Sequence, residues 1–151
     1  MTDISKTISA KILSHSVAKQ TDMLALLKRA VTIESPSQNP ETQAPVFQLF
    51  SDFLISLGYR CRFLRGKTSG GQMLAIPSSR KRHTPQQLVL GHVDTVWPLG
   101  TLETMPVESR EGCLHGPGSY DMKAGLVQAA FAIQTLLELG LEPTLAPILF
   151  I

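Results

Sequence analysis

Two short stretches of the sequence carry side chains that could bind a metal ion. The first is residues 91–95, GHVDT, which follow the apolar run at residues 88–90. In an extended backbone His92 and Asp94 point to the same side, because they are two residues apart. A carboxylate behind a histidine holds one ring nitrogen and leaves the other free for an ion. The spacing therefore favours a metal site where a strand ends.

The second stretch is residues 116–123, GPGSYDMK, with Asp121 at the start of a predicted helix. Such ends of strands and helices are where α/β proteins usually place their chemistry. Taken singly, His92 is more often structural, Asp94 a turn residue and Asp121 a helix cap. A dinucleotide loop is excluded, because the third glycine of that motif would fall at Asp121, and a carboxylate there would repel a phosphate.

The elements that position these stretches follow from hydrophobic periodicity. Residues 88–90 are expected to form a buried strand, and residues 146–151 another, near the end of the sequence. Residues 122–139 are the clearest predicted helix, with Gly140 as its stop and Lys123 on its polar side. The apolar face of that helix consists of Leu126, Ala130, Ile133 and Leu137. A hairpin is expected at residues 107–114.

The first third of the chain contains two further predicted helices. Residues 1–16 are polar and are expected to be a frayed lead-in, and residues 17–31 have the periodicity of an amphipathic helix. After a loop, Asn39 is a candidate cap for a helix that runs to Leu57. Strands are predicted at residues 59–64 and 72–76. This order of elements predicts an α/β fold with helices packed on a mixed sheet.

Composition excludes several classes of protein. The 151 residues are 43% hydrophobic, enough for one domain with a core, and the net charge of +2 does not favour nucleic acid or a membrane surface. No apolar run is long enough for a spanning helix, and the basic run at residues 80–83 fits a solvated turn. Cys61 and Cys113 form no metal motif, so a cytoplasmic, reduced protein is expected.

Together, GHVDTVWPLGTL and HGPGSYDMKAGL resemble the motifs of the di-zinc exopeptidases and deacylases. That family includes glutamate carboxypeptidase (carboxypeptidase G), acetylornithine deacetylase and succinyl-diaminopimelate desuccinylase, and the segment at residues 97–101 is most similar to the first of these. The resemblance implies that His92 binds one zinc and that Asp121 bridges two. It gives Asp94 a catalytic role, orienting the ring of His92 and raising its basicity. It also implies a cis peptide bond between Asp121 and Met122.

The resemblance further implies that residues 1–151 are the N-terminal half of a zinc-peptidase-type catalytic domain. In such an enzyme two zinc ions activate water to cleave a C-terminal amide bond, with release of glutamate as one expectation. The substrate would be a small peptide or, for a deacylase, an N-acyl amino acid. The family's Glu-Glu pair, its later ligands and its lid or dimerisation domain fall outside this sequence. We therefore expect an incomplete domain that is inactive alone and binds zinc weakly; a full-length form could be a homodimer.

A second hypothesis comes from another class of protein. The chain would be a non-catalytic α/β remnant that keeps the metal motif by descent and binds a partner through an open apolar sheet edge at residues 146–151. The sequence alone leaves both hypotheses open.

Overall fold

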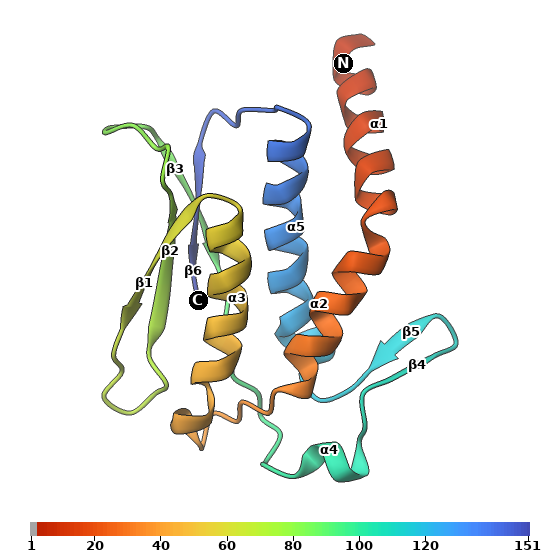
Figure 1. Ribbon diagram of the computed structural model, residues 1–151, viewed down its shortest axis with the longest axis vertical. Coiled ribbons are helices and arrows are strands. Elements are labelled where there is room, and N and C mark those ends of the chain that lie inside the picture. Colours follow the sequence, from red (N-terminus) through yellow and green to blue (C-terminus); the bar gives the residue numbers. More distant parts are fainter. Residues whose placement is uncertain (1–2) are drawn as a thin grey trace.

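A four-stranded sheet with all the larger helices on one side forms the framework of the protein, as seen in a computed structural model that describes residues 3–151. α3 and α5 lie beside the sheet, and α1 and α2 lie beyond α5 (Figure 1). A small hairpin and a short helix project from the end of the molecule at which α2 ends. The predicted α/β class, with helices on a mixed sheet, is confirmed.

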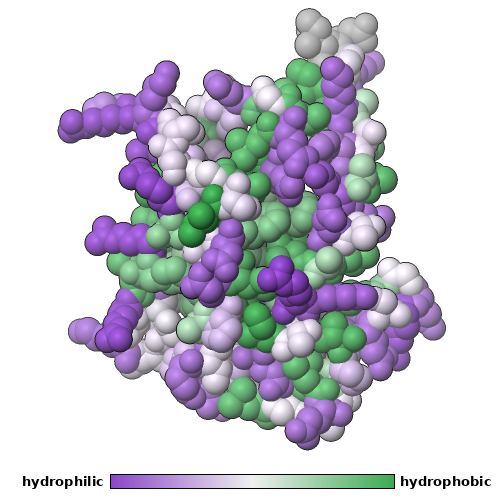
Figure 2. Space-filling view, viewed as in Figure 1, coloured by the Kyte–Doolittle hydropathy of each residue, from purple (hydrophilic) through white to green (hydrophobic). Residues whose placement is uncertain are grey.

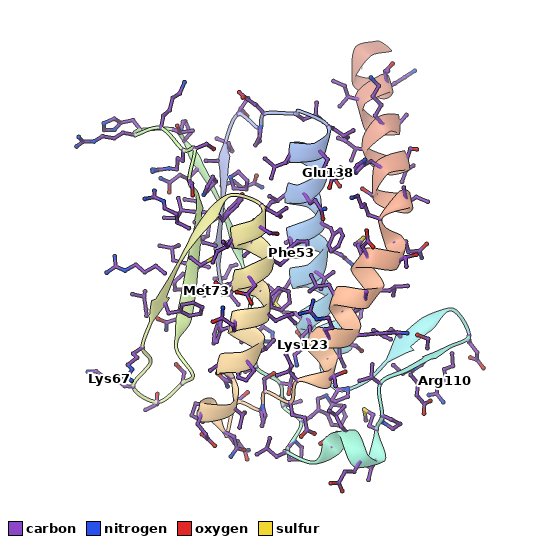
Figure 3. The ribbon with its side chains drawn as sticks, viewed as in Figure 1. Phe53, Lys67, Met73, Arg110, Lys123 and Glu138 are labelled. Atoms are coloured by element: carbon purple, nitrogen blue, oxygen red, sulfur yellow. The ribbon has the colours of Figure 1, made fainter. Side chains whose placement is uncertain are left out.

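The N-terminal segment is helical, contrary to the expected frayed lead-in. α1 spans Asp3–Ala18 and α2 spans Gln20–Thr32, with a break at Lys19; residues 1–2 lie outside the described residues. The end of α1 and the break after it contact Glu138 at the end of α5 (Figure 3). Glu138 accepts a hydrogen bond from Lys19 Nζ at 2.9 Å and lies 2.8 Å from Nε2 of His15 in α1. The helix was missed because this partner is more than a hundred residues away.

α3 begins later than its sequence signals suggest. Asn39 precedes a separate 3₁₀ turn, η1 at Pro40–Thr42, and makes no side-chain cap bond; α3 itself spans Ala44–Ser56. The stop at Gly58 is confirmed, because this glycine has a φ of 81° that a residue with a side chain rarely adopts.

The sheet contains β1 (Tyr59–Leu64), β2 (Gln72–Pro77), β3 (Gln86–Leu90) and β6 (Ala146–Phe150) in the order β1-β2-β6-β3. β6 pairs antiparallel with β2 and parallel with β3. The expected open edge at residues 146–151 is therefore wrong, because β6 lies inside the sheet.

β3 is an edge strand of the described sheet rather than a buried strand. Leu88 and Leu90 are 63% and 66% exposed, so the expected burial of residues 88–90 is wrong for both leucines, whereas Val89 is partly buried against the core. Their apolar character resembles that of a strand covered on both faces, but among residues 3–151 nothing packs over these two leucines closely enough to bury them.

The core fills the space between the sheet and α2, α3 and α5. Phe53 of α3 stacks on Phe131 of α5 with ring centroids 5.1 Å apart, and Met73 of β2 is fully buried (Figure 3). Hydrophilic side chains project along the side of the molecule where the sheet lies, and hydrophobic atoms show between them (Figure 2). Each Å² of apolar surface that is buried contributes about 25 cal/mol to the free energy of folding, so this core is the main source of stability.

The remaining elements surround the two sequence motifs. α4 spans Thr101–Thr104, and β4 (Glu108–Arg110) and β5 (Cys113–His115) form the predicted hairpin around Glu111 and Gly112, both at positive φ. η2, an irregular helical turn at Ser119–Lys123, leads into α5 at Ala124–Glu138. Leu126, Ala130 and Ile133 are buried as expected, whereas Leu137 is 53% exposed. Within the described residues, no helix combines the length and apolarity needed to cross a bilayer.

Candidate metal centre

His92 and Asp121 meet although twenty-eight residues lie between them. His92 follows β3, and Asp121 lies in η2, at the entrance to α5. The Nε2 atom of His92 is 3.2 Å from Oδ1 of Asp121. The side chains are 45% and 82% exposed, so both are open to solvent.

The other ring nitrogen of His92 faces oxygen atoms of Asp94. Nδ1 is 3.0 Å from the backbone carbonyl oxygen of Asp94 and 3.4 Å from its carboxylate oxygen Oδ1. Two oxygens around Nδ1 assign the ring proton to that nitrogen, because a ring N–H must donate and an oxygen without hydrogen can only accept. The backbone carbonyl is thus the nearer partner, and the carboxylate is the second.

This arrangement leaves a lone pair of Nε2 facing a carboxylate oxygen. Two acceptors at 3.2 Å repel one another unless a cation lies between them, either a second ring proton or a metal ion. Ligand atoms about 2.0–2.1 Å from a tetrahedral zinc lie about 3.3 Å apart. The imidazole and the carboxylate are therefore spaced so that both could bind one ion. Among residues 3–151, no three histidine, cysteine or carboxylate side chains converge in this way.

The two motifs also contact one another through the backbone. The N–H of His92 lies 3.3 Å from Sδ of Met122, and Gly91 approaches Leu126 so closely that a Cβ atom there would lie 2.5 Å from Leu126 Cδ2. The peptide bond between Asp121 and Met122 is cis, as the resemblance implies. The loop after β3 therefore packs directly on the start of α5.

Residues 33–37, which we call the brace segment, hold both motifs from the side of α2. Lys123 is 1% exposed and donates from Nζ to the carbonyl oxygen of Ile33 at 2.7 Å, so its predicted place on the polar side of α5 is wrong (Figure 3). Burial lowers the pKa of Lys123 to about 8, and the nearby Glu34 carboxylate opposes that shift.

Glu34 of the brace segment fixes the loop that follows the first motif. Its two carboxylate oxygens accept hydrogen bonds from the backbone N–H groups of Gly100 and Leu102 at 2.9 and 3.0 Å. These bonds favour the charged form and lower the pKa of Glu34. The brace segment was predicted only as a loop, and its partners lie too far along the chain for any local signal to reveal them.

A cavity of about 330 Å³ opens over the candidate ligands. His92, Asp94 and Asp121 line it together with Trp97 and Tyr120, and Tyr120 is 94% exposed. A second cavity of about 350 Å³ lies on the other side of His92 and Asp94, toward Phe150. A small organic substrate could thus reach the candidate ligands directly from solvent.

Comparison with known proteins agrees with the resemblance of the motifs. Residues 88–151 match the model of peptidase family M20/M25/M40. Among curated protein sequences, none matches the chain.

Solved structures of peptidases share the fold. Human carnosine dipeptidase 1 has a TM-score of 0.78 at 19% identity, over 93% of this chain and 33% of that one. The di-peptidase Dug1p from Saccharomyces cerevisiae has a TM-score of 0.76 at 13% identity, with the same coverage. The M20 family metallo-carboxypeptidase Sso-CP2 from Sulfolobus solfataricus has a TM-score of 0.70 at 18% identity, over 85% of this chain and 30% of that one. The chain thus spans about a third of the length of each.

Proposed function

We propose, from its resemblance to the metallopeptidases of family M20/M25/M40, that this chain is the metal-binding N-terminal part of a hydrolase that cleaves an amide bond. The observation that carries the proposal is the 3.2 Å separation of His92 Nε2 and Asp121 Oδ1, with Nδ1 of His92 occupied by oxygens of Asp94. Nε2 of His92 and Oδ1 of Asp121 are thus placed where both could bind one cation, with the other ring nitrogen already engaged.

Each residue has a distinct role in this proposal. His92 would help to hold one zinc, and Asp121 would be shared between two zinc ions. Asp94 would keep the ring of His92 in the tautomer that leaves Nε2 free. Zinc ions bound in this way would supply an acidified water and a polarised amide carbonyl.

The ligand set within this chain is incomplete for catalysis. A catalytic zinc takes three protein ligands and keeps one open position, whereas the described residues bring two candidate ligands together. The chain spans about a third of its structural neighbours, so we place the remaining ligands and the general base in parts of such enzymes that it does not span. The 151 residues alone should then show no measurable zinc-dependent amide hydrolysis.

The substrate we favour is a small peptide cleaved at its C-terminal amide bond, with glutamate as one candidate product. An N-acyl amino acid is the alternative, because peptidases and deacylases would share the same zinc chemistry. The proposed cellular site is the cytoplasm, and a full-length form is proposed as a homodimer.

A non-catalytic binding module is the second candidate function. It is supported by Leu88 and Leu90, which leave an apolar surface exposed on the edge strand β3. Exposed apolar surface of this kind is typical of interaction sites.

Zinc titration of the 151-residue protein, followed by NMR and calorimetry, tests the metal site. We expect weak binding that perturbs the ring of His92 and falls at least about 10-fold in His92→Ala and Asp121→Asn. His83→Asn is a matched control, because His83 lies in the β2–β3 turn at a φ of 68° and asparagine tolerates that backbone. Unchanged zinc affinity in His92→Ala would end the proposal.

A further inference from the structure

Ser37 of the brace segment touches the residue that orients the candidate metal ligand. Its hydroxyl Oγ donates a hydrogen bond to Oδ2 of Asp94 at 2.6 Å. The other carboxylate oxygen of Asp94, Oδ1, lies 3.4 Å from Nδ1 of His92. Ser37, Asp94 and His92 thus form a continuous chain of polar contacts that ends at Asp121.

The backbone of Ser37 is held by hydrogen bonds of its own, and its hydroxyl has a second, more distant acceptor in the carbonyl oxygen of Thr95 at 3.2 Å. Its N–H donates to the carbonyl oxygen of Thr95 at 2.9 Å, and Pro36 and Thr95 form a parallel bridge. Gln43, which is 4% exposed, donates from Nε2 to the carbonyl oxygen of Pro36 at 3.1 Å. The hydroxyl group is therefore presented to Asp94 by a backbone that is already ordered.

Ser35 holds the backbone on either side of Asp94. Its hydroxyl donates to the carbonyl oxygen of Val93 at 2.7 Å, and its own carbonyl accepts from the N–H of Thr95 at 2.9 Å. Ser35 and Val93 are almost completely buried. Asp94 is thus bracketed on both sides by residues tied to the brace segment, while its side chain is held by Ser37 alone among the hydrogen bonds of the described residues.

We propose that Ser37 is a positioning residue for the metal centre, acting on His92 through the carboxylate of Asp94. The inference rests on the proposed function. A carboxylate held at Oδ2 keeps Oδ1 directed at the imidazole, and together with the Asp94 carbonyl it restrains the ring and its Nδ1 proton. Without the hydroxyl, the Asp94 carboxylate can turn toward the cavity, and the restraint on His92 falls to the backbone carbonyl.

Zinc titration of Ser37→Ala and Ser37→Thr in the 151-residue protein tests this role. Removing a group that orients a metal ligand typically costs 10–100-fold in metal affinity, and Ser37 acts one contact further away, so we expect Ser37→Ala to lose about 3- to 10-fold. Ser37→Thr keeps the hydroxyl and should bind zinc like the unchanged protein. Ser56→Ala is the control, because its hydroxyl bonds only to Phe53 in α3.

Two readouts separate positioning from a general structural effect. In an Asp94→Ala background, Ser37→Ala should have no further effect on zinc affinity, because its target is gone. In the metal-free protein, the ¹⁵N shifts of the His92 ring should move from one tautomer toward a mixture in Ser37→Ala but not in Ser56→Ala.

Three outcomes would overturn the inference. Zinc affinity and ring shifts unchanged in Ser37→Ala would show that Ser37 does not position His92. An equal loss of affinity with and without Asp94 would show that Ser37 acts on the fold instead. If His92→Ala itself leaves zinc binding unchanged, the proposed function fails first, and the role of Ser37 fails with it.

Discussion

Gly118, three residues before Asp121, offers a sharp test of how tightly the two motifs are packed. It is buried and has a φ of 71°, and it immediately precedes η2. In Gly118→Ala the new Cβ would lie 2.4 Å from Cγ2 of Thr95 and 3.4 Å from its Cβ. The substitution therefore combines a strained backbone with a clash against the first motif.

The two contributions can be estimated separately. A left-handed backbone costs an alanine about 1–2 kcal/mol, and overpacking a well-filled site costs about 1–3 kcal/mol. Thr95 cannot easily move away, because its N–H and carbonyl are bonded to the brace segment and its β-branched side chain is stiff. The expected loss in the free energy of unfolding is about 2–5 kcal/mol, a large part of the 5–15 kcal/mol typical of a domain.

Urea denaturation of four variants isolates the clash: Gly118→Ala, Gly112→Ala, Thr95→Ser, and Gly118→Ala combined with Thr95→Ser. Gly112→Ala is the control, because Gly112 has a φ of 76° with no atom within 4 Å of its added Cβ, and it should lose only the backbone term of about 1–2 kcal/mol. In a Thr95→Ser background the clashing methyl is absent, and Gly118→Ala should cost no more than Gly112→Ala does. Equal losses for the two alanine variants, or no recovery with Thr95→Ser, would refute this packing of the motifs.

Two further predictions concern stability. Glu34→Gln should lower the free energy of unfolding at pH 7 by about 1–2 kcal/mol, since it weakens two bonds to backbone N–H groups. The folded-state pKa of Glu34 lies below its usual 4.5, so the difference in stability between the two proteins is fully present above pH 4.5 and shrinks as the pH falls. Urea titrations from pH 7 to 3 that show a constant difference would contradict this prediction. Phe131→Ala should lower the free energy of unfolding by about 3–5 kcal/mol and Phe63→Ala by less than about 2 kcal/mol, because Phe131 is 3% exposed and Phe63 is 50% exposed. Similar melting temperatures for both variants would contradict the assigned core.

The sequence predicted elements whose signals are local. Gly58 and Gly140 mark helix ends because each residue after the helix must adopt a positive φ, and the hairpin at residues 107–114 follows from its Glu-Gly turn. Asn39 misled the prediction because it precedes only a short 3₁₀ turn, which its side chain does not cap, and α3 begins later.

Features that depend on distant partners could not be predicted. Lys123 has helical spacing on a polar side, yet its partner is the carbonyl of Ile33, ninety residues earlier in the chain. Leu88 and Leu90 read as core residues because hydrophobicity does not reveal which strand lies at an edge.

The candidate site likewise has a part that the sequence predicts and a part that it does not. The pairing of His92 with Asp121 was expected only because two motifs together resemble a family. Ser37 gave no signal at all, since a serine in a polar loop is ordinary and its contact with Asp94 spans 57 positions.

The order in which a ribosome makes the strands differs from their order in the sheet. The β1–β2 hairpin can close as soon as it leaves the exit tunnel, but β3 has no neighbour until β6 emerges and slots in beside it. Until then the nascent polypeptide carries an unpaired strand that contains Leu88, Val89 and Leu90, and such exposed apolar segments are prone to aggregate. Among the described strands, β6 thus joins the β1–β2 hairpin to β3.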